Sequence, residues 1–527
     1  MNSEKAMAYR TFSNKVCMLL IKHTCAILSV IFISVLFFGV YSVISNQLTG
    51  LPISDFLPGW SDMADYYTGI NTAANVGFFS SNAGYTGYIF DNNDVSVAGS
   101  LFYGPHGAFI IIPYVIIAKI IGWGGAAPLI AHLILMTAAF IILYFCSADI
   151  KKTIIVQIVC FSFVPFIGYY FTMMMEIQMY AWGIVLTALT WAYMNKPNKA
   201  NHIGMIICIV VASAIRVTNL VFGIPYFILI LHELYEEKRF SNTIIKKTAI
   251  GFLSVLAVWI LYILHNFLRA RFKGSFLWNL TTTFNGKGKL AGFQLFVNHF
   301  LSNTVSYFNP NESVLHYVLL RYAVFGFAVL LLVRAISFSW KRKIIFKLKS
   351  IEELSLSIIL FSIVFLNIAF YDIGQGRDFR VMATVFISVI TYTIISGKKF
   401  FKEACVGIVL CLVFLSHFSW VNRIINRNFG EFYTNEWASH LQYEPDAKSR
   451  YENVMVDQTG EDRYYDIPPG VGRLAVLGSF TADHMAELGI RYILVRPDKS
   501  DIPTETVGAL YEILATHDDW ILYILKE

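Results

Sequence analysis

Long apolar segments recur along the chain and are separated by short polar or basic segments. The runs 24–46, 246–268 and 402–421 each reach the roughly 20 residues that an α-helix needs to cross the hydrocarbon core of a membrane. The first run is too long for the apolar part of a signal peptide and lacks a convincing small-residue cleavage site, so we expect it to be retained. This pattern predicts an α-helical membrane protein with many crossings.

The composition agrees with this pattern. Hydrophobic residues make up 56% of the 527 residues and charged residues only 14%, against about 25% charged in soluble domains. The net charge of +6 is dispersed in short clusters, which argues against nucleic-acid binding. All seven cysteines lie in apolar runs or in the N-terminal segment, and this placement suggests neither a disulfide nor a CxxC metal site.

The orientation depends on the segment 101–123. A full crossing here would put the basic clusters at 151–152 and 196–199 outside, against the positive-inside rule. We therefore expect residues 107–122 to form a helix at the outer interface, broken near Pro113. About eleven crossings then follow, with the N-terminus in the cytoplasm: 24–46, 126–146, 153–170, 174–194, 203–217, 220–235, 246–268, 315–337, 353–371, 379–396 and 402–421.

One apolar run, 203–235, is too long for a single upright helix. Arg216, Thr218 and Asn219 interrupt it, so we expect a hairpin of two short helices with Arg216 near the outer face.

The larger polar pieces divide the chain into two domains. Residues 1–421 are expected to form the transmembrane domain, and residues 422–527 an extracytoplasmic α/β domain, with predicted strands in RLAVLGS, IRYILVR and WILYILK and a helix in TADHMAEL. A buried strand core explains the apolar runs of this tail without any functional site. The transmembrane domain carries two outer loops, 47–106 and 269–314, where we expect the function to reside.

The first outer loop is acidic. It contains no Lys or Arg, and on a helix Asp62, Asp65 and Tyr66 share one face through i+3 and i+4 spacing. A purely structural role is the simpler alternative: Ser61 can be the N-cap of a helix, and the helix dipole favours acidic residues in its first turn.

Lys and Arg are enriched in cytoplasmic loops, so a positively charged residue in an outer loop calls for an explanation. Arg269, Arg271 and Lys273 follow a helix end, where they can reach lipid phosphates. Arg377 differs, because it lies in the Gly-flanked turn GQGRD, where a salt bridge with Asp378 is the alternative to a ligand.

Four stretches together resemble the C-type integral-membrane glycosyltransferases, the GT-C superfamily, which transfer sugars from polyprenyl-phosphate donors at the outer membrane face. They are DMADYY, YGPHGAFIIIPY, the pair MMMEIQMYAWGIVLTALTWAY and AIRVTNLVFGIP, and GRDFRVMATV. The second lacks the usual double proline, Val217 replaces a proline in the third, and Asp378 and Phe379 interrupt the Arg-Tyr pattern of the fourth. The resemblance implies a GT-C-like fold with interfacial helices in the first outer loop, in the plasma membrane (the inner membrane of a bacterium).

The resemblance also implies roles on the acceptor side. Asp62 is expected to be the general base that takes the proton of the acceptor hydroxyl, and Asp65 to hold the acceptor or to share a divalent metal with Asp62. Tyr66 or Tyr67 is expected to stack on a sugar, and Glu176 to bind sugar or to pair with an arginine. No cofactor is certain, since two carboxylates alone do not make a metal site.

On the donor side, cations must stabilise the charge that develops on the leaving phosphate. Arg216, Arg377 and Arg380 are expected to bind that phosphate, with a hydrogen bond from His106. A lone His beside Gly and Pro is otherwise a structural turn residue. Because one base and no second carboxylate can be nominated, we expect inversion at the sugar carbon.

The expected partners are a polyprenyl-phosphate-linked sugar, a glycan, lipid or protein acceptor, and the lipid bilayer. A transporter or flippase of a lipid-linked glycan is an alternative, although the sequence has no internal repeat and few ionisable residues near predicted midplanes. An O-antigen ligase or polymerase is a second alternative, although such enzymes place their main outer loop late in the chain. A scaffold with a sensing tail would leave Asp62 and Arg377 unexplained.

Overall fold

A computed structural model gives the structure of the chain. It describes residues 3–50, 52–53, 63–78, 86–89, 108–196, 198–238, 240–267, 276–309, 315–342, 348–370, 383–397, 436–458, 467–476, 481–496, 504–517 and 520–526. The statements below concern these residues.

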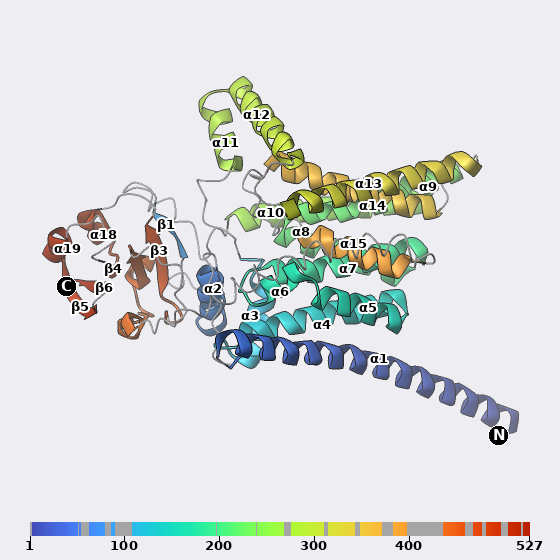
Figure 1. Ribbon diagram of the computed structural model, residues 1–527, viewed down its shortest axis with the longest axis horizontal. Coiled ribbons are helices and arrows are strands. Elements are labelled where there is room, and N and C mark those ends of the chain that lie inside the picture. The colour runs from blue at the N-terminus through green and yellow to red at the C-terminus, as the bar shows by residue number, and fades with distance from the viewer. Residues whose placement is uncertain are drawn as a thin grey trace.

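A bundle of helices forms the larger part of the molecule, and its helices run roughly side by side (Figure 1). Their bounds are α1 Ser3–Thr49, α4 Ala127–Ser147, α5 Ile150–Phe161, α6 Val164–Tyr170, α7 Glu176–Asn195, α8 Lys199–Ile215, η3 Val217–Gly223, α9 Ile224–Glu237, α10 Asn242–Phe267, α13 Leu315–Arg342, α14 Leu348–Phe370 and α15 Ala383–Ser396.

Five described helical segments are long and apolar enough to cross a membrane: Leu20–Thr49, Ala127–Ser147, Val217–Glu237, Asn242–Leu264 and Ile351–Phe370. The predicted class, an α-helical polytopic membrane protein with a small C-terminal α/β region, is therefore confirmed. The count of eleven crossings is not, and the expected crossing at 402–421 lies outside the described residues.

Helix α7 is the centre of the bundle. Nearly all its side chains are buried, and it packs against α4, α8 and α15. Gly183 allows the closest of these approaches, because a Cβ at this position would lie 2.9 Å from the carbonyl oxygen of Thr384 and would overlap the side chain of Ile387. Small residues permit such backbone contact between membrane helices.

The apolar run 203–235 breaks where the sequence predicts. Helix α8 ends at Ile215, Arg216 is extended, and η3 and α9 follow. The backbone amide of Arg216 and the side-chain amide of Asn219 both donate to the carbonyl oxygen of Ala212, each at 2.9 Å, which satisfies the end of α8. The predicted interruption is confirmed.

Two short helices from the first loop cover one end of the bundle: α2 (Met63–Asn75) and α3 (Ile112–Ile121). At about 1.5 Å per residue, α3 is too short to cross a membrane. The expected helix 107–122, broken near Pro113, begins instead at Ile112 and has Pro113 in its first turn. This position suits proline, because the first turn needs no donated backbone N–H.

A mixed sheet of six strands lies at the same end of the bundle, here called the sheet end (Figure 1). The strand order is β1-β3-β2-β4-β6-β5, in which β1, β3, β2 and β4 are parallel and β6 is antiparallel to both neighbours. The elements are β1 Thr86–Ile89, η4 Glu436–His440, η5 Arg450–Asn453, β2 Val454–Asp457, β3 Gly472–Val476, α18 Ala482–Glu487, β4 Tyr492–Val495, α19 Thr504–Leu510, β5 Tyr511–His517 and β6 Trp520–Leu525.

The edge strand β1 comes from the first loop rather than from the C-terminal tail. It pairs in parallel with β3, from Thr86 opposite Arg473 to Ile89 opposite Val476. The sheet is therefore shared between the two domains that the sequence separates. The expected boundary at residue 422 lies outside the described part of the chain.

A buried ion pair joins β2 and β3. Both Nε and Nη2 of Arg473 donate to Oδ2 of Asp457, at 3.1 and 2.8 Å. Apolar side chains pack on the sheet around this pair, so each charge depends on the other for compensation.

Replacing Gly183 with Ala tests the close contact between α7 and α15. We expect Gly183→Ala to lower the melting temperature of the full chain in detergent, since overpacking a core costs about 1–3 kcal/mol. Gly326→Ala on α13 is the matched control, because a Cβ there meets no atom within 4 Å. Equal melting temperatures for the two variants would show that this contact is not tight.

Candidate functional site

Helix α2 lies on α3 through a buried tyrosine face. Tyr66 and Tyr67 are both buried, and the indole N–H of Trp123 donates to the carbonyl oxygen of Tyr67 at 3.2 Å. The rings of Tyr67 and Trp123 are 5.5 Å apart. In this arrangement both tyrosines serve packing, and the expected stacking on a sugar stays a prediction.

The same helix is fixed to the sheet. The backbone amide of Gly470 donates to the hydroxyl of Thr72 at 3.0 Å in a buried position, and β1 follows α2 in the chain. Helix α2 is therefore held on one side by the bundle and on the other by the sheet.

Aromatic side chains of α3, α4 and α6 pack against one another on the bundle side of α3. The ring of Tyr114, on α3, lies edge-on to His132, on α4, with 5.6 Å between centroids. Nδ1 of His132 lies 3.1 Å from the carbonyl oxygen of Tyr170, and the Tyr170 hydroxyl donates to the carbonyl oxygen of Leu129 at 2.9 Å. Because a carbonyl oxygen only accepts, Nδ1 carries the hydrogen and Nε2 faces away from this bond.

Glu176 is the first residue of α7 and is buried at the same level. A carboxylate at a helix N-terminus interacts favourably with the helix dipole. Burial, and then the charge of Glu176, raise the pKa of the Tyr114 phenol well above its usual value. Tyr114 therefore keeps its proton at neutral pH and can donate a hydrogen bond.

Three buried side chains at this level hold polar atoms that have no hydrogen-bond partner in the described structure. They are the Tyr114 hydroxyl, Nε2 of His132 and the Tyr180 hydroxyl. We call these three residues together with Glu176 the polar cluster. Leaving a polar group unsatisfied in an apolar medium costs several kcal/mol, on the order of 2–7, so the cluster is suited to a polar ligand.

The polar cluster lies close to the sheet end. His132 is in the second turn of α4 and Tyr180 in the second turn of α7, within about 8 Å of the helix ends at 1.5 Å per residue. Because α4, with 21 residues, is about as long as the hydrocarbon core is thick, the cluster lies in the outer part of that core rather than at its middle. Glu176 could be predicted from the sequence but its three neighbours could not, because the signal of each is a single polar residue inside an apolar run.

The other predicted site residues are placed only in part. Asp65 is in the first turn of α2. Arg216 is half-buried at the break after α8. Helix α7 begins at the sheet end, and α8 follows it after a short turn and packs on it, so the end of α8 and Arg216 lie back at the sheet end. Four predicted site residues lie outside the described residues: Asp62, His106, Arg377 and Arg380.

No group of three or more His, Cys, Asp or Glu side chains that could hold a metal ion occurs within the described ranges. The metal site expected at Asp62 and Asp65 includes a residue outside those ranges, so it stays a prediction.

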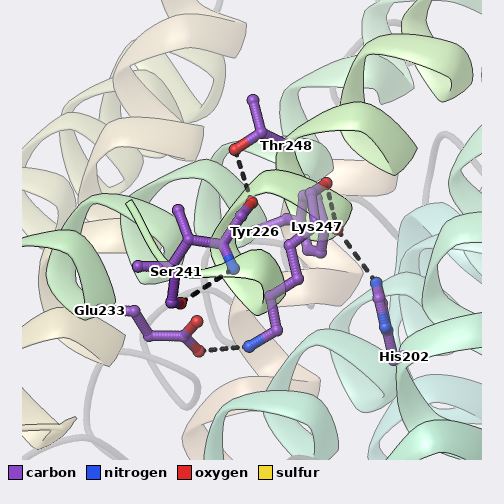
Figure 2. Close-up of polar contacts among 7 residues, drawn as sticks. His202, Tyr226, Glu233, Ser241, Lys247 and Thr248 are labelled. Atoms are coloured by element: carbon purple, nitrogen blue, oxygen red, sulfur yellow. Dashed lines mark hydrogen bonds and ion pairs between the residues drawn. The ribbon is translucent and has the colours of Figure 1, made fainter. Parts of the chain in front are cut away.

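A second group of polar side chains lies on α8, α9 and α10, and its contacts connect these three helices (Figure 2). The Tyr226 hydroxyl donates to the carbonyl oxygen of Lys247 at 2.7 Å, so Nε2 of His202, 3.1 Å away, is the donor to Tyr226. Lys247 also forms an ion pair with Glu233. These contacts fasten three helices together, and their polar groups satisfy one another, unlike those of the polar cluster.

No family model and no curated protein matches this chain. Among solved structures, the chain is similar to the crystal structure of ArnT from Cupriavidus metallidurans bound to undecaprenyl phosphate, with 11% sequence identity and a TM-score of 0.43 over 93% of this chain and 97% of that chain. It is similar to the apo structure of the same protein with 11% identity and a TM-score of 0.42 over the same shares.

The contact between Thr72 and Gly470 can be tested by hydrogen exchange. We expect Thr72→Val to speed amide exchange in 467–476, because a buried N–H that loses its acceptor costs about 1–3 kcal/mol. Asn75→Ala on the same helix is the control, since Asn75 is exposed and bonds only to Asn71. Unchanged exchange at Gly470 in Thr72→Val would contradict the proposed link.

Proposed function

We propose that this protein is a membrane glycosyltransferase that moves a sugar from a polyprenyl-phosphate donor to an envelope glycan, lipid or protein acceptor. The observation that carries this proposal is the polar cluster. It places unsatisfied hydroxyl and imidazole groups and one carboxylate in the first two turns of α4 and α7 and on α3, near the sheet end of the bundle.

The chemistry of the cluster fits a sugar better than a phosphate. Its members are Tyr114, His132, Tyr180 and Glu176, and none is a Lys or Arg. Sugar hydroxyls both donate and accept hydrogen bonds, which suits Tyr114, Tyr180 and the carboxylate of Glu176. A phosphate instead needs arginines, and on this proposal Arg216, Arg377 and Arg380 supply them.

The lipid part of the donor fits the position of the cluster. A polyprenyl chain stays in the hydrocarbon core while its phosphate and sugar reach the interface. A site in the first two turns of α4 and α7 meets that head group without drawing the lipid out of the membrane.

The proposed mechanism is a single displacement. Polyprenyl phosphate is a good leaving group, so the acceptor hydroxyl needs a base but the donor needs no obvious general acid. Asp62 is proposed as this base; in the sequence it directly precedes Met63, the first residue of α2. Asp65 holds the acceptor or shares a divalent metal with Asp62, and the sugar carbon is inverted.

The sheet end is proposed to face away from the cytoplasm. The clusters Lys151/Lys152 and Lys196/Lys199 lie at turns of the bundle opposite α2 and α3, and cytoplasmic loops are enriched in Lys and Arg. The N-terminus is then cytoplasmic and the C-terminal domain extracytoplasmic.

Reconstitution in vesicles with a panel of polyprenyl-phosphate sugars tests this function. We expect donor consumption with at least one sugar, and we expect Asp62→Asn to slow it by about 10²–10⁴-fold, the usual contribution of a general base. Asp55→Asn, in the same acidic loop, is the control and should keep its activity.

Two results would contradict the proposal. Consumption of no donor, together with movement of a lipid-linked glycan across the vesicle membrane, would indicate a transporter. Wild-type turnover by Asp62→Asn would remove Asp62 from the mechanism while leaving the activity itself in place.

A further inference from the structure

A helical hairpin projects sideways from the bundle. Helices α11 (Phe276–Gly286) and α12 (Lys289–Phe308) extend beyond α13 and α14 and run across their direction (Figure 1). The turn between them contains Gly288 with a φ of 92°, and Lys287 and Lys289 on either side of it are exposed. The hairpin belongs to the second predicted loop, to which the proposed function assigns no role.

The hairpin is seated on the last turns of α14. The side-chain amide of Asn303 donates to the carbonyl oxygen of Ile368 at 2.9 Å, and the ring of Phe300 lies 5.6 Å from that of Phe365. Since α14 ends at Phe370, these contacts fall within about 8 Å of the helix end at 1.5 Å per residue. The α12 helix therefore crosses α14 at the level where the membrane core meets the headgroups.

One face of α12 is covered by α11. The ring of His299 stacks on Phe276 with 3.4 Å between centroids, and Gly292 lies so close to Phe284 that an added Cβ would be 2.6 Å from the ring. This packing fixes how α12 is rotated about its axis.

The opposite face of α12 is apolar and exposed. Four large side chains have exposed fractions of more than half: Leu290 at 71%, Phe293 at 59%, Leu301 at 56% and Val305 at 69%. At 100° per residue they fall within an arc of about 120°, which also contains the exposed Gln294, and we call these four residues the stripe. Exposed polar residues, Asn298 and Ser302, lie beside the stripe.

We propose that this hairpin lies in the plane of the membrane at the sheet end, with the α12 stripe in contact with lipid acyl chains. The stripe continues a surface that already faces lipid, because Phe365 is 52% exposed on a membrane-spanning helix and contacts Phe300. Interfacial helices bury their apolar face about 5–10 Å into the headgroup and acyl boundary, which matches the depth of α12. Lys287 and Lys289 at the tip suit lipid phosphates.

Such a hairpin has a structural consequence for the segment that follows α14. Its lipid contacts hold the last turns of α14 at a fixed depth, and the chain leaves α14 at Phe370 toward residue 377. The lipid contact itself stands on the geometry of α12 and is independent of the proposed glycosyl transfer.

Site-specific photocrosslinking tests this contact in the full chain. Benzoylphenylalanine is placed at Leu301 or Phe293 on the stripe and, as matched controls, at Ser302 or Asn298. Each protein is illuminated in vesicles of phosphatidylethanolamine and phosphatidylglycerol, and adducts are identified by mass spectrometry. All four positions are exposed or lie at the helix surface, so the substitutions do not disturb packing.

We expect lipid adducts at Leu301 and Phe293 in several-fold higher yield than at Ser302 and Asn298. Equal yields of lipid adduct at the four positions would overturn the proposal. Crosslinks from Leu301 to a second protein chain in place of lipid would also overturn it, since the stripe would then be a protein interface.

Discussion

The hydrocarbon core of a membrane contains no water to satisfy polar groups, and this constraint governs how the bundle is built. Each interruption or polar side chain must find a partner inside the protein. At the break after α8, Asn219 supplies it by bonding to Ala212. At the group on α8, α9 and α10, His202, Tyr226 and Lys247 satisfy one another.

The polar cluster departs from this rule, and its position gives the departure meaning. Tyr114, His132 and Tyr180 hold unsatisfied atoms beneath α3. Directly above, α2 joins the bundle to the sheet through Thr72. Unsatisfied polar groups under a helix that is held from both sides provide a rigid place for a polar ligand that enters from the membrane.

The sequence predicted features that depend on local pattern and missed those that depend on distant pairing. Periodicity and charge located the helices, the break at Arg216 and the strands of the tail. Strand β1 was missed because TGYI is short and gains its stability only by pairing with β3, far along the chain. Single polar residues such as His132 resemble satisfied core residues until their neighbours are known.

The central claim is that the polar cluster binds the sugar of a lipid-linked donor. Native mass spectrometry of the full chain can compare a polyprenyl-phosphate sugar with polyprenyl phosphate alone, for the wild type and for Tyr114→Phe and Tyr180→Phe. The account predicts that the wild type prefers the sugar-bearing lipid and that both variants lose this preference while still binding the phosphate. Equal affinity of the wild type for the two lipids, or a preference unchanged in both variants, would contradict it.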